Sequence, residues 1–141
     1  MPRAPFLPAL AAHGGAGAAG SPDERPERRR GLVDAAQVGV EILRGGGSAL
    51  DAAVATVIAL ENHPLFNAGY GSLLTTDGTA EMDASVMHAT PAHNDANAPA
   101  GAVGAVSRVR NPITLARAVM ERTPHLLMVG AGAERFARRV G

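Results

Sequence analysis

Apolar residues recur at the spacing of a helix in two stretches of the first half of the chain. One face of the first stretch consists of Leu32, Ala36, Val40 and Leu43. Residues at this spacing share one side of a helix and can pack together against a core. Three glycines at 45–47 predict its end, and the polar residues 21–30 before it indicate a solvated loop or helix start.

A second helix is expected after Ser48, whose hydroxyl group is suited to cap the first turn. Its apolar stripe consists of Leu50, Val54, Val57 and Ile58. We expect this helix to run to about Glu61, because Pro64 disfavours helical geometry at the residue before it. Residues 65–71 then predict a loop with two glycines.

Short apolar runs bounded by turn residues predict strands. We expect them at residues 6–12, 72–76, 79–89, 101–109 and 126–129. The pair Asp77-Gly78 joins the second and third of these in a β-hairpin, because Asp-Gly supplies the positive φ angles of a two-residue turn.

Two further helices are expected in the last third of the chain. Asn111 is a suitable cap and Pro112 a suitable first residue for a helix that runs to about Arg122. A final amphipathic segment carries Phe136 and Val140. Helices and strands together predict an α/β fold.

The length and composition are those of one folded domain or of a piece of one. The chain has 141 residues, of which 46% are hydrophobic, and its 17 glycines and 10 prolines provide for many turns. Its formal net charge is zero, so no field of one sign favours nucleic acid or an anionic membrane as a partner. The absence of cysteine excludes disulfides, a thiolate nucleophile and zinc–thiolate sites.

A cytoplasmic location is expected. No apolar stretch approaches the roughly 20 residues that a membrane helix needs. Residues 1–12 contain three prolines and only a short apolar run, which makes a poor core for a signal peptide.

Two patterns resemble ligand sites but lack the required context. Residues 15–20 match the dinucleotide fingerprint G-x-G-x-x-G. The polar, proline-containing segment that follows does not suit the helix on which this motif depends, so we expect a flexible turn. His88, His93 and Asp95 lie across a polar loop without the rigid spacing of metal ligands, so we expect exposed loop residues.

The acidic residues Asp77, Glu81 and Asp83 stand at hairpin spacing. Glu81 and Asp83 share one face of the predicted strand, because side chains two residues apart point to the same side. A charge pair on the strand face or a buried salt bridge explains them without general acid or base chemistry.

The remaining candidate is the segment of residues 60–71. The end of a helix leaves carbonyl groups without partners, and a tight loop turns further carbonyls inward. Two interpretations stay open here, a cage for a hard monovalent cation and a rigid loop without a ligand. Asn67 is the polar residue that we expect at a site, because its amide both donates and accepts hydrogen bonds beside a glycine-bearing turn.

Six strings of residues occur in a fixed order along the sequence. They are His13-Gly14-Gly15-Ala16-Gly17, Pro64-Leu65-Phe66-Asn67-Ala68-Gly69, Glu81-Met82-Asp83-Ala84-Ser85, Gly101-Ala102-Val103, Asn111-Pro112-Ile113 and Leu115-Ala116-Arg117-Ala118-Val119-Met120. Together they resemble the N-terminal, or α, portion of the plant-type L-asparaginase / isoaspartyl peptidase family of N-terminal-nucleophile threonine hydrolases. The resemblance covers nearly all of residues 1–141, and the polar loop 90–98 is its weakest part.

The resemblance implies one part of a four-layer αββα sandwich, made as a precursor that cleaves itself before a threonine. In the family that threonine lies in a Gly-Thr-Val-Gly-type segment of the β portion, and no such segment occurs in this sequence. We therefore expect residues 1–141 to form an α portion that is inactive alone. The expected partner is the β portion, in a dimer of αβ units that acts on a small-molecule substrate.

The resemblance also assigns roles to particular residues. Asn67 would support the region of the nucleophile. The loop near the self-cleavage site would consist of His13, Gly14, Gly15, Ala16 and Gly17. No organic cofactor is implied, but a structural sodium ion would bind main-chain oxygens. These oxygens would belong to Leu60, Glu61, His63, Phe66, Ala68 and Tyr70.

The implied activity is the hydrolysis of L-asparagine and β-aspartyl dipeptides. One alternative is the α portion of a glycosylasparaginase, which shares the scaffold. The other is a non-catalytic fragment or interaction module that retains the fold without the activity.

Overall fold

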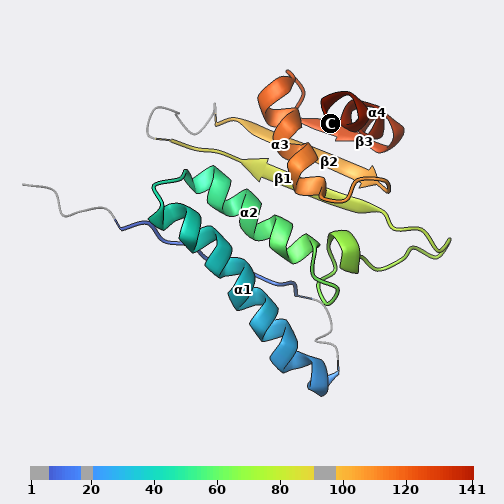
Figure 1. Cartoon of the computed structure of the whole chain (residues 1–141). Coiled ribbons are helices and arrows are strands. Elements are labelled where there is room, and N and C mark those ends of the chain that lie inside the picture. The colour runs from blue at the N-terminus through green and yellow to red at the C-terminus, as the bar shows by residue number, and fades with distance from the viewer. Residues whose placement is uncertain (1–6, 17–20, 91–97) are drawn as a thin grey trace, which may run out of the picture.

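The computed structural model describes residues 7–16, 21–90 and 98–141, and it places a three-stranded sheet beside four helices (Figure 1). The helices are α1 (Arg25–Arg44), α2 (Ala49–Glu61), α3 (Pro112–Arg122) and α4 (Gly130–Val140). The strands are β1 (Met82–Met87), β2 (Ala100–Val106) and β3 (Leu127–Val129). Two short 3-10 helices are η1 (Pro22–Glu24) and η2 (Gly69–Gly71).

Helices α1 and α2 lie side by side (Figure 1). The predicted cap of α2 is confirmed, since the hydroxyl oxygen of Ser48 accepts a hydrogen bond from the N–H of Asp51 at 3.0 Å. In α1 the buried residues are Gly31, Ala35 and Gly39, whereas the predicted face around Leu32 is only partly buried. The reason is the close approach of the two helices, because a Cβ atom on Gly39 would lie 3.0 Å from the carbonyl oxygen of Ala52.

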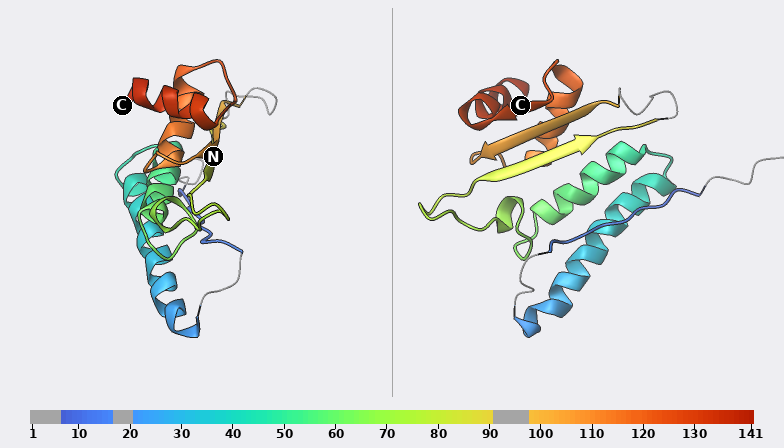
Figure 2. Two further views of the ribbon diagram at one scale, coloured as in Figure 1. Left: turned by 90° about the vertical axis from the view of Figure 1, so that its right-hand side faces the viewer. Right: turned by 180° about the vertical axis from the view of Figure 1, so that it is seen from behind.

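The sheet has the order β1-β2-β3, in which β1 is antiparallel and β3 parallel to β2. Helices α3 and α4 pack against one face, and the core there contains Val103 and Val106 of β2, Val119 of α3 and Phe136 of α4. Seen from behind, no helix covers the other face (Figure 2). The described chain thus has a layer of helices and a layer of strands.

The prediction of a strand at residues 6–12 is wrong for the described residues of this segment. Residues 7–12 do not pair with the sheet, and Phe6 lies outside the described residues. They cross α1 and α2 in an extended path (Figure 2), where the side chain of Leu10 lies against Gly39. An apolar run suits a strand, but pairing also needs a neighbouring strand, and the described sheet has none next to this segment.

The predicted hairpin forms only near its turn. Leu74 and Ala80 make one isolated bridge, and the strand that continues from it, β1, pairs with β2 instead. The turn also differs, because Gly78 has a φ of 77° but Asp77 has no positive φ. The carbonyl oxygen of Thr75 accepts the N–H of Gly78 at 2.9 Å, which describes a wider turn with one left-handed residue.

Helices α3 and α4 and strands β2 and β3 lie where the sequence predicts them, within a few residues. Most of the polar loop 90–98 lies outside the described residues. Among residues 7–16, 21–90 and 98–141, no helix combines the length and the apolar character that a bilayer crossing requires.

Candidate functional site

The candidate site is built on the loop of residues 62–68, between α2 and η2. The N–H of His63 donates to the carbonyl oxygen of Leu60 at 3.1 Å and closes the last turn of α2. The Nδ1 atom of His63 accepts the N–H of Leu65 at 3.2 Å. Arg28 of α1 donates from Nη1 to the carbonyl oxygen of Leu65. The loop is therefore held both from within and from α1.

Phe66 anchors this loop in the molecule. Its side chain is 5% exposed and packs against Ala35 of α1 and Leu60 of α2. Its ring meets that of His63 edge-on, with 5.0 Å between the ring centroids. Gly14 lies against the same ring, since a Cβ atom there would come within 2.8 Å of Cε1 of Phe66. Two segments singled out in the sequence, far apart along the chain, thus meet at Phe66.

The glycine segment is described from His13 to Ala16, and Gly17 lies outside the described residues. His13 is exposed, and its Nδ1 atom accepts the N–H of Gly15 at 3.4 Å. Gly15 has a φ of 116°, a conformation that side chains disfavour. Glycine is required at position 14 for space and at position 15 for backbone conformation.

Asn67 follows Phe66 at the surface. Its Oδ1 atom accepts the N–H of Leu73 at 2.9 Å, so the side chain ties the loop to the segment that follows η2. This bond fixes the orientation of the amide group next to the point where Gly14 and Phe66 meet.

Backbone carbonyl groups converge on the two glycines of η2. A Cβ atom on Gly71 would lie 2.7 Å from the carbonyl oxygen of Pro64, 2.9 Å from that of His63 and closer still to that of Phe66. Gly69, with a φ of 54°, approaches the carbonyl oxygen of Glu61 in the same way. Hard cations prefer such oxygen ligands, so the residues present fit a small monovalent cation.

The six residues named for the sodium ion are placed differently. The carbonyl groups of Glu61, His63 and Phe66 face the glycines of η2. Four of the six carbonyl groups also accept hydrogen bonds of local turns: that of Leu60 from the N–H of His63, that of His63 from Phe66, that of Phe66 from Ala68, and that of Ala68 from Gly71. Tyr70 belongs to η2, and its side chain is exposed.

The carboxyl group of Glu61 has a role that the sequence analysis missed. It is buried, and its oxygens accept hydrogen bonds from the N–H of Ile113 at 3.0 Å and from Nδ2 of Asn111 at 3.1 Å. Asn111 stands at the N-cap position of α3, as predicted, but its side chain makes no capping hydrogen bond; the carboxyl group of Glu61, from α2, accepts the N–H of Ile113 in the first turn. Burial raises the pKa of Glu61, although these two hydrogen bonds act in the opposite direction.

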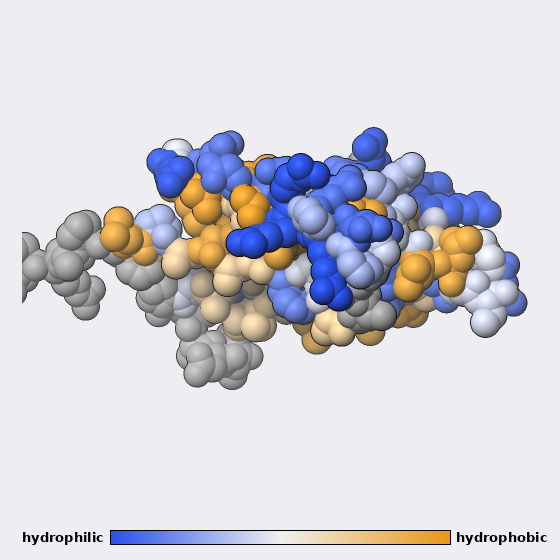
Figure 3. All heavy atoms as spheres, turned by 90° about the horizontal axis from the view of Figure 1, so that it is seen from below, coloured by the Kyte–Doolittle hydropathy of each residue, from blue (hydrophilic) through white to orange (hydrophobic). Residues whose placement is uncertain are grey.

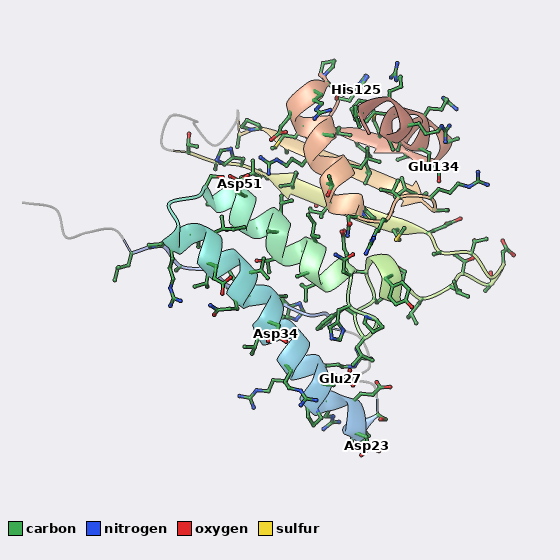
Figure 4. The ribbon with its side chains drawn as sticks, in the orientation of Figure 1. Asp23, Glu27, Asp34, Asp51, His125 and Glu134 are labelled. Carbon is green, nitrogen blue, oxygen red and sulfur yellow. The ribbon has the colours of Figure 1, made fainter. Side chains whose placement is uncertain are left out.

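A second contact joins α2 to α3 at the other end of α2. Nη1 of Arg117 lies 2.7 Å from Oδ1 of Asp51, which stands at the start of α2 (Figure 4). The hydroxyl group of Ser48 and then the guanidinium group of Arg117 lower the pKa of Asp51. Helix α3 is thus fixed along α2, and the site loop lies at the end where Glu61 holds it.

The other acidic and histidine candidates do not form a site in the described residues. Asp83 accepts the N–H of Ala105 with Oδ1 at 2.8 Å and stabilises a bulge between β1 and β2. This is neither the charge pair nor the buried salt bridge that was expected. The described part of the chain contains no cluster of acidic or histidine residues that could hold a metal ion. His93 and Asp95 lie outside it.

The only Gly-Thr pair in the sequence, Gly78-Thr79, lies in the hairpin turn. The N–H of Thr79 donates to Oγ1 of Thr75 at 3.3 Å, and its carbonyl oxygen accepts the N–H of Thr75 at 2.8 Å. Both backbone groups of this threonine serve the turn.

Comparison with known proteins gives consistent matches over most of the chain. A family model described as Asparaginase matches residues 6–141. The isoaspartyl peptidase/L-asparaginase of Homo sapiens is 48% identical over 134 residues, which cover 95% of this chain and 42% of that protein. The plant-type L-asparaginase of Pyrococcus horikoshii is 46% identical over 133 residues, 94% of this chain and 41% of that protein. The chain thus spans about 42% of the length of such relatives.

Proposed function

Because this chain belongs to the asparaginase family, we propose that it is the α portion of an amidohydrolase that acts on L-asparagine and β-aspartyl dipeptides. The observation that carries the proposal is the meeting of the His13–Ala16 segment with Phe66, next to Asn67. Support also comes from the names of the relatives and from the part of their length that this chain does not span.

The proposed chemistry divides the work between two portions. A threonine at the start of the β portion is the nucleophile, and its own α-amino group takes the proton from its hydroxyl as the hydroxyl attacks the substrate carbonyl. Hydrogen-bond donors then stabilise the oxyanion of the tetrahedral intermediate. In this proposal Asn67 positions the region of the nucleophile, and residues 13–17 form the loop beside the self-cleavage site.

The carbonyl groups around η2 are proposed to hold a structural sodium ion. The ligands would come from the main chain of the six residues named in the sequence analysis, and Pro64 offers a further carbonyl group beside Gly71. An ion there would neutralise converging carbonyl dipoles and so hold the loop that carries Asn67.

The arrangement of layers suggests how the partner would fit. The described helices and strands supply one helical layer and one sheet layer. In the proposed four-layer sandwich, the uncovered face of the sheet would pack on a second sheet, completed by the β portion, and two αβ units would form a dimer. We propose a cytoplasmic location for this assembly.

The proposal is tested by measuring ammonia release from L-asparagine. The chain alone is compared with a fusion in which it is followed by the part of the Pyrococcus horikoshii relative that it does not match. We expect no turnover by the chain alone and turnover by the fusion after self-cleavage. Turnover by the chain alone would refute the division of labour.

A variant of the fusion tests the role of Asn67. Asn67→Ala should lower kcat by about 100-fold, the order of loss that a misplaced reacting group causes. Gln37→Ala, on the exposed face of α1, is the control and should leave kcat unchanged. A folded, cleaved fusion without activity would instead favour the interaction module, and activity restricted to glycosylated asparagine would favour a glycosylasparaginase.

A further inference from the structure

A surface hollow of about 570 Å³ lies where the connection from β2 to α3 passes η2. Its polar lining residues are Asn62, Tyr70, Ser107, Arg108 and Arg110. No aspartate or glutamate lines it. The volume is in the range of small-molecule sites, and neither Asn67 nor the glycine segment contributes to it.

The two arginines of this hollow have no carboxylate partner among the described residues. The ion pairs there engage Arg28 and Arg117. Two guanidinium groups without an ion-pair partner on one concave surface create a local positive potential, although the chain as a whole has no net charge. Concave surfaces of one charge sign concentrate ions of the opposite sign.

The neighbouring acidic groups are engaged by other donors. Oε1 of Glu134, on α4 at the end of β2 (Figure 4), accepts the N–H groups of Ser107 and Arg108 at 3.0 and 3.2 Å. Glu61 is occupied by the start of α3. These carboxylates hold the backbone of the connection in place.

The side chain of Arg110 is oriented as well. Its Nε atom donates to Oδ1 of Asn62 at 3.3 Å, and Nδ2 of Asn111 donates to the same oxygen at 3.3 Å. The segment from Ser107 to Asn111 is therefore fixed at both ends, so a ligand would find the site largely formed and lose little affinity to ordering.

We propose that this hollow binds a small dianion, either a dicarboxylate or phosphate. A guanidinium group offers parallel N–H donors that match two oxygens of a carboxylate or phosphate. Arg108 and Arg110 supply two such groups for two negative charges, and the hydroxyl groups of Ser107 and Tyr70 add neutral donors. The ligand would use the hydroxyl group of Tyr70 and not its main-chain oxygen, and it would contact neither Asn67 nor the glycine segment.

Calorimetric titration of the 141-residue chain at low ionic strength tests the proposal. The probes are inorganic phosphate, succinate and, as a monoanion of similar chemistry, acetate. We expect saturable binding of phosphate or succinate, and the tighter of the two identifies the source of the dianion. Acetate should bind at least about tenfold more weakly, because it engages one guanidinium group instead of two.

Two double variants separate the site from general charge effects. Arg108→Ala/Arg110→Ala should weaken binding by about 100-fold, about tenfold for each charge-assisted contact. Arg138→Ala/Arg139→Ala removes the same charge from the exposed end of α4 and should leave the affinity within about twofold, because neither arginine lines the hollow. Circular dichroism verifies that each variant is folded, and Arg108→Lys/Arg110→Lys replaces the alanine variant if it is not.

Absence of saturable binding of either dianion overturns the proposal. Equal weakening of binding in the two double variants also overturns it, because the affinity would then depend on the overall positive charge of the chain and not on this hollow. The titration measures binding alone. An inactive fusion in the asparaginase assay therefore does not contradict the dianion site, and absence of dianion binding does not contradict the proposed hydrolytic function.

Discussion

Glu61 joins two elements through one buried side chain. The residue is 3% exposed, and its carboxyl group accepts hydrogen bonds from the first turn of α3 and from Asn111. Burial disfavours the charged form and raises its pKa above the ordinary value of glutamate. Over the pH interval between these two values, the folded chain keeps a proton that the unfolded chain has lost.

The free energy of unfolding should therefore decrease as the pH rises through this interval. The contribution of Glu61 is fully present below the unfolded pKa and is lost above the folded one. Glu61→Gln cannot titrate, so the wild type should lose stability relative to this variant between acidic and neutral pH. Urea unfolding of both chains across that range measures the difference, with Glu41→Gln on exposed α1 as control. A difference that is flat, or that favours the wild type as pH rises, contradicts the prediction.

Ala105 is strained in a way that its neighbours are not. It is the one described residue other than glycine with a positive φ, at 51°, and it lies in the bulge that Asp83 stabilises. The left-handed conformation costs an L-residue roughly 1–2 kcal/mol, whereas glycine adopts it without that cost but loses about 0.5–1 kcal/mol in chain entropy.

We expect Ala105→Gly to raise the free energy of unfolding by up to about 1.5 kcal/mol, the difference of these two terms. The matched control is Ala102→Gly on the same strand, where φ is not positive, and which should destabilise by about 0.5–1 kcal/mol. Urea unfolding midpoints compare them. Equal destabilisation by both would show that the bulge carries no strain.

At the scale of elements, the loop of residues 62–68 and η2 form one unit that the backbone holds together. A Cβ atom on Gly71 would meet carbonyl oxygens of the loop, and one on Gly69 would meet that of Glu61 at the end of α2. A side chain at either position would have to displace backbone atoms. Backbone atoms move less easily than the end of a flexible side chain. The unit therefore depends on two glycines more than on any single hydrogen bond.

Gly71→Ala should destabilise the chain by about 1–3 kcal/mol, the usual cost of overpacking. Gly132→Ala is the opposite case, since a Cβ atom there meets nothing within 4 Å and the residue lies inside α4. That variant should stabilise by about 0.5–1 kcal/mol. Denaturant unfolding of both variants measures the two changes in the free energy of unfolding. No change in Gly71→Ala would mean that the carbonyl groups around Gly71 leave room for a side chain.

At the scale of the whole molecule, the described chain has one covered and one uncovered sheet face (Figure 2). The uncovered face bears the exposed side chains of Met87, Leu127 and Val129, and β1 and β3 are both edge strands. Further exposed apolar residues, Leu73 and Leu74, lie beside the hairpin turn. A view from below shows hydrophobic surface at that end of the molecule, next to a broad hydrophilic area (Figure 3).

Exposed apolar faces and free strand edges promote association. We expect the chain alone to associate in a concentration-dependent manner in analytical ultracentrifugation. Leu127→Lys/Val129→Lys, on the uncovered face, should reduce this association, whereas Val33→Lys on α1, also an exposed position, should not. A monomer at all concentrations would show that the uncovered face does not drive assembly.

The sequence by itself determined the elements whose signals are local. The ends of α1 and α2 are set by residues next to them in the sequence: the glycines at 45–47, the cap at Ser48 and the break at Pro64. Few distant contacts are therefore needed to define these two helices. The ordered strings of residues likewise indicated the family, which the comparisons confirm over residues 6–141.

Only the tertiary structure decided the pairings between distant residues. It left residues 7–12 outside the sheet and placed Gly14 on Phe66. It also gave the N–H of Ile113, in the first turn of α3, to the carboxyl group of Glu61, 52 residues away, and not to the side chain of Asn111. Each outcome depends on which surfaces meet when the elements pack. A contact or hydrogen bond between residues far apart in the sequence leaves no periodic pattern along the chain from which it could be predicted.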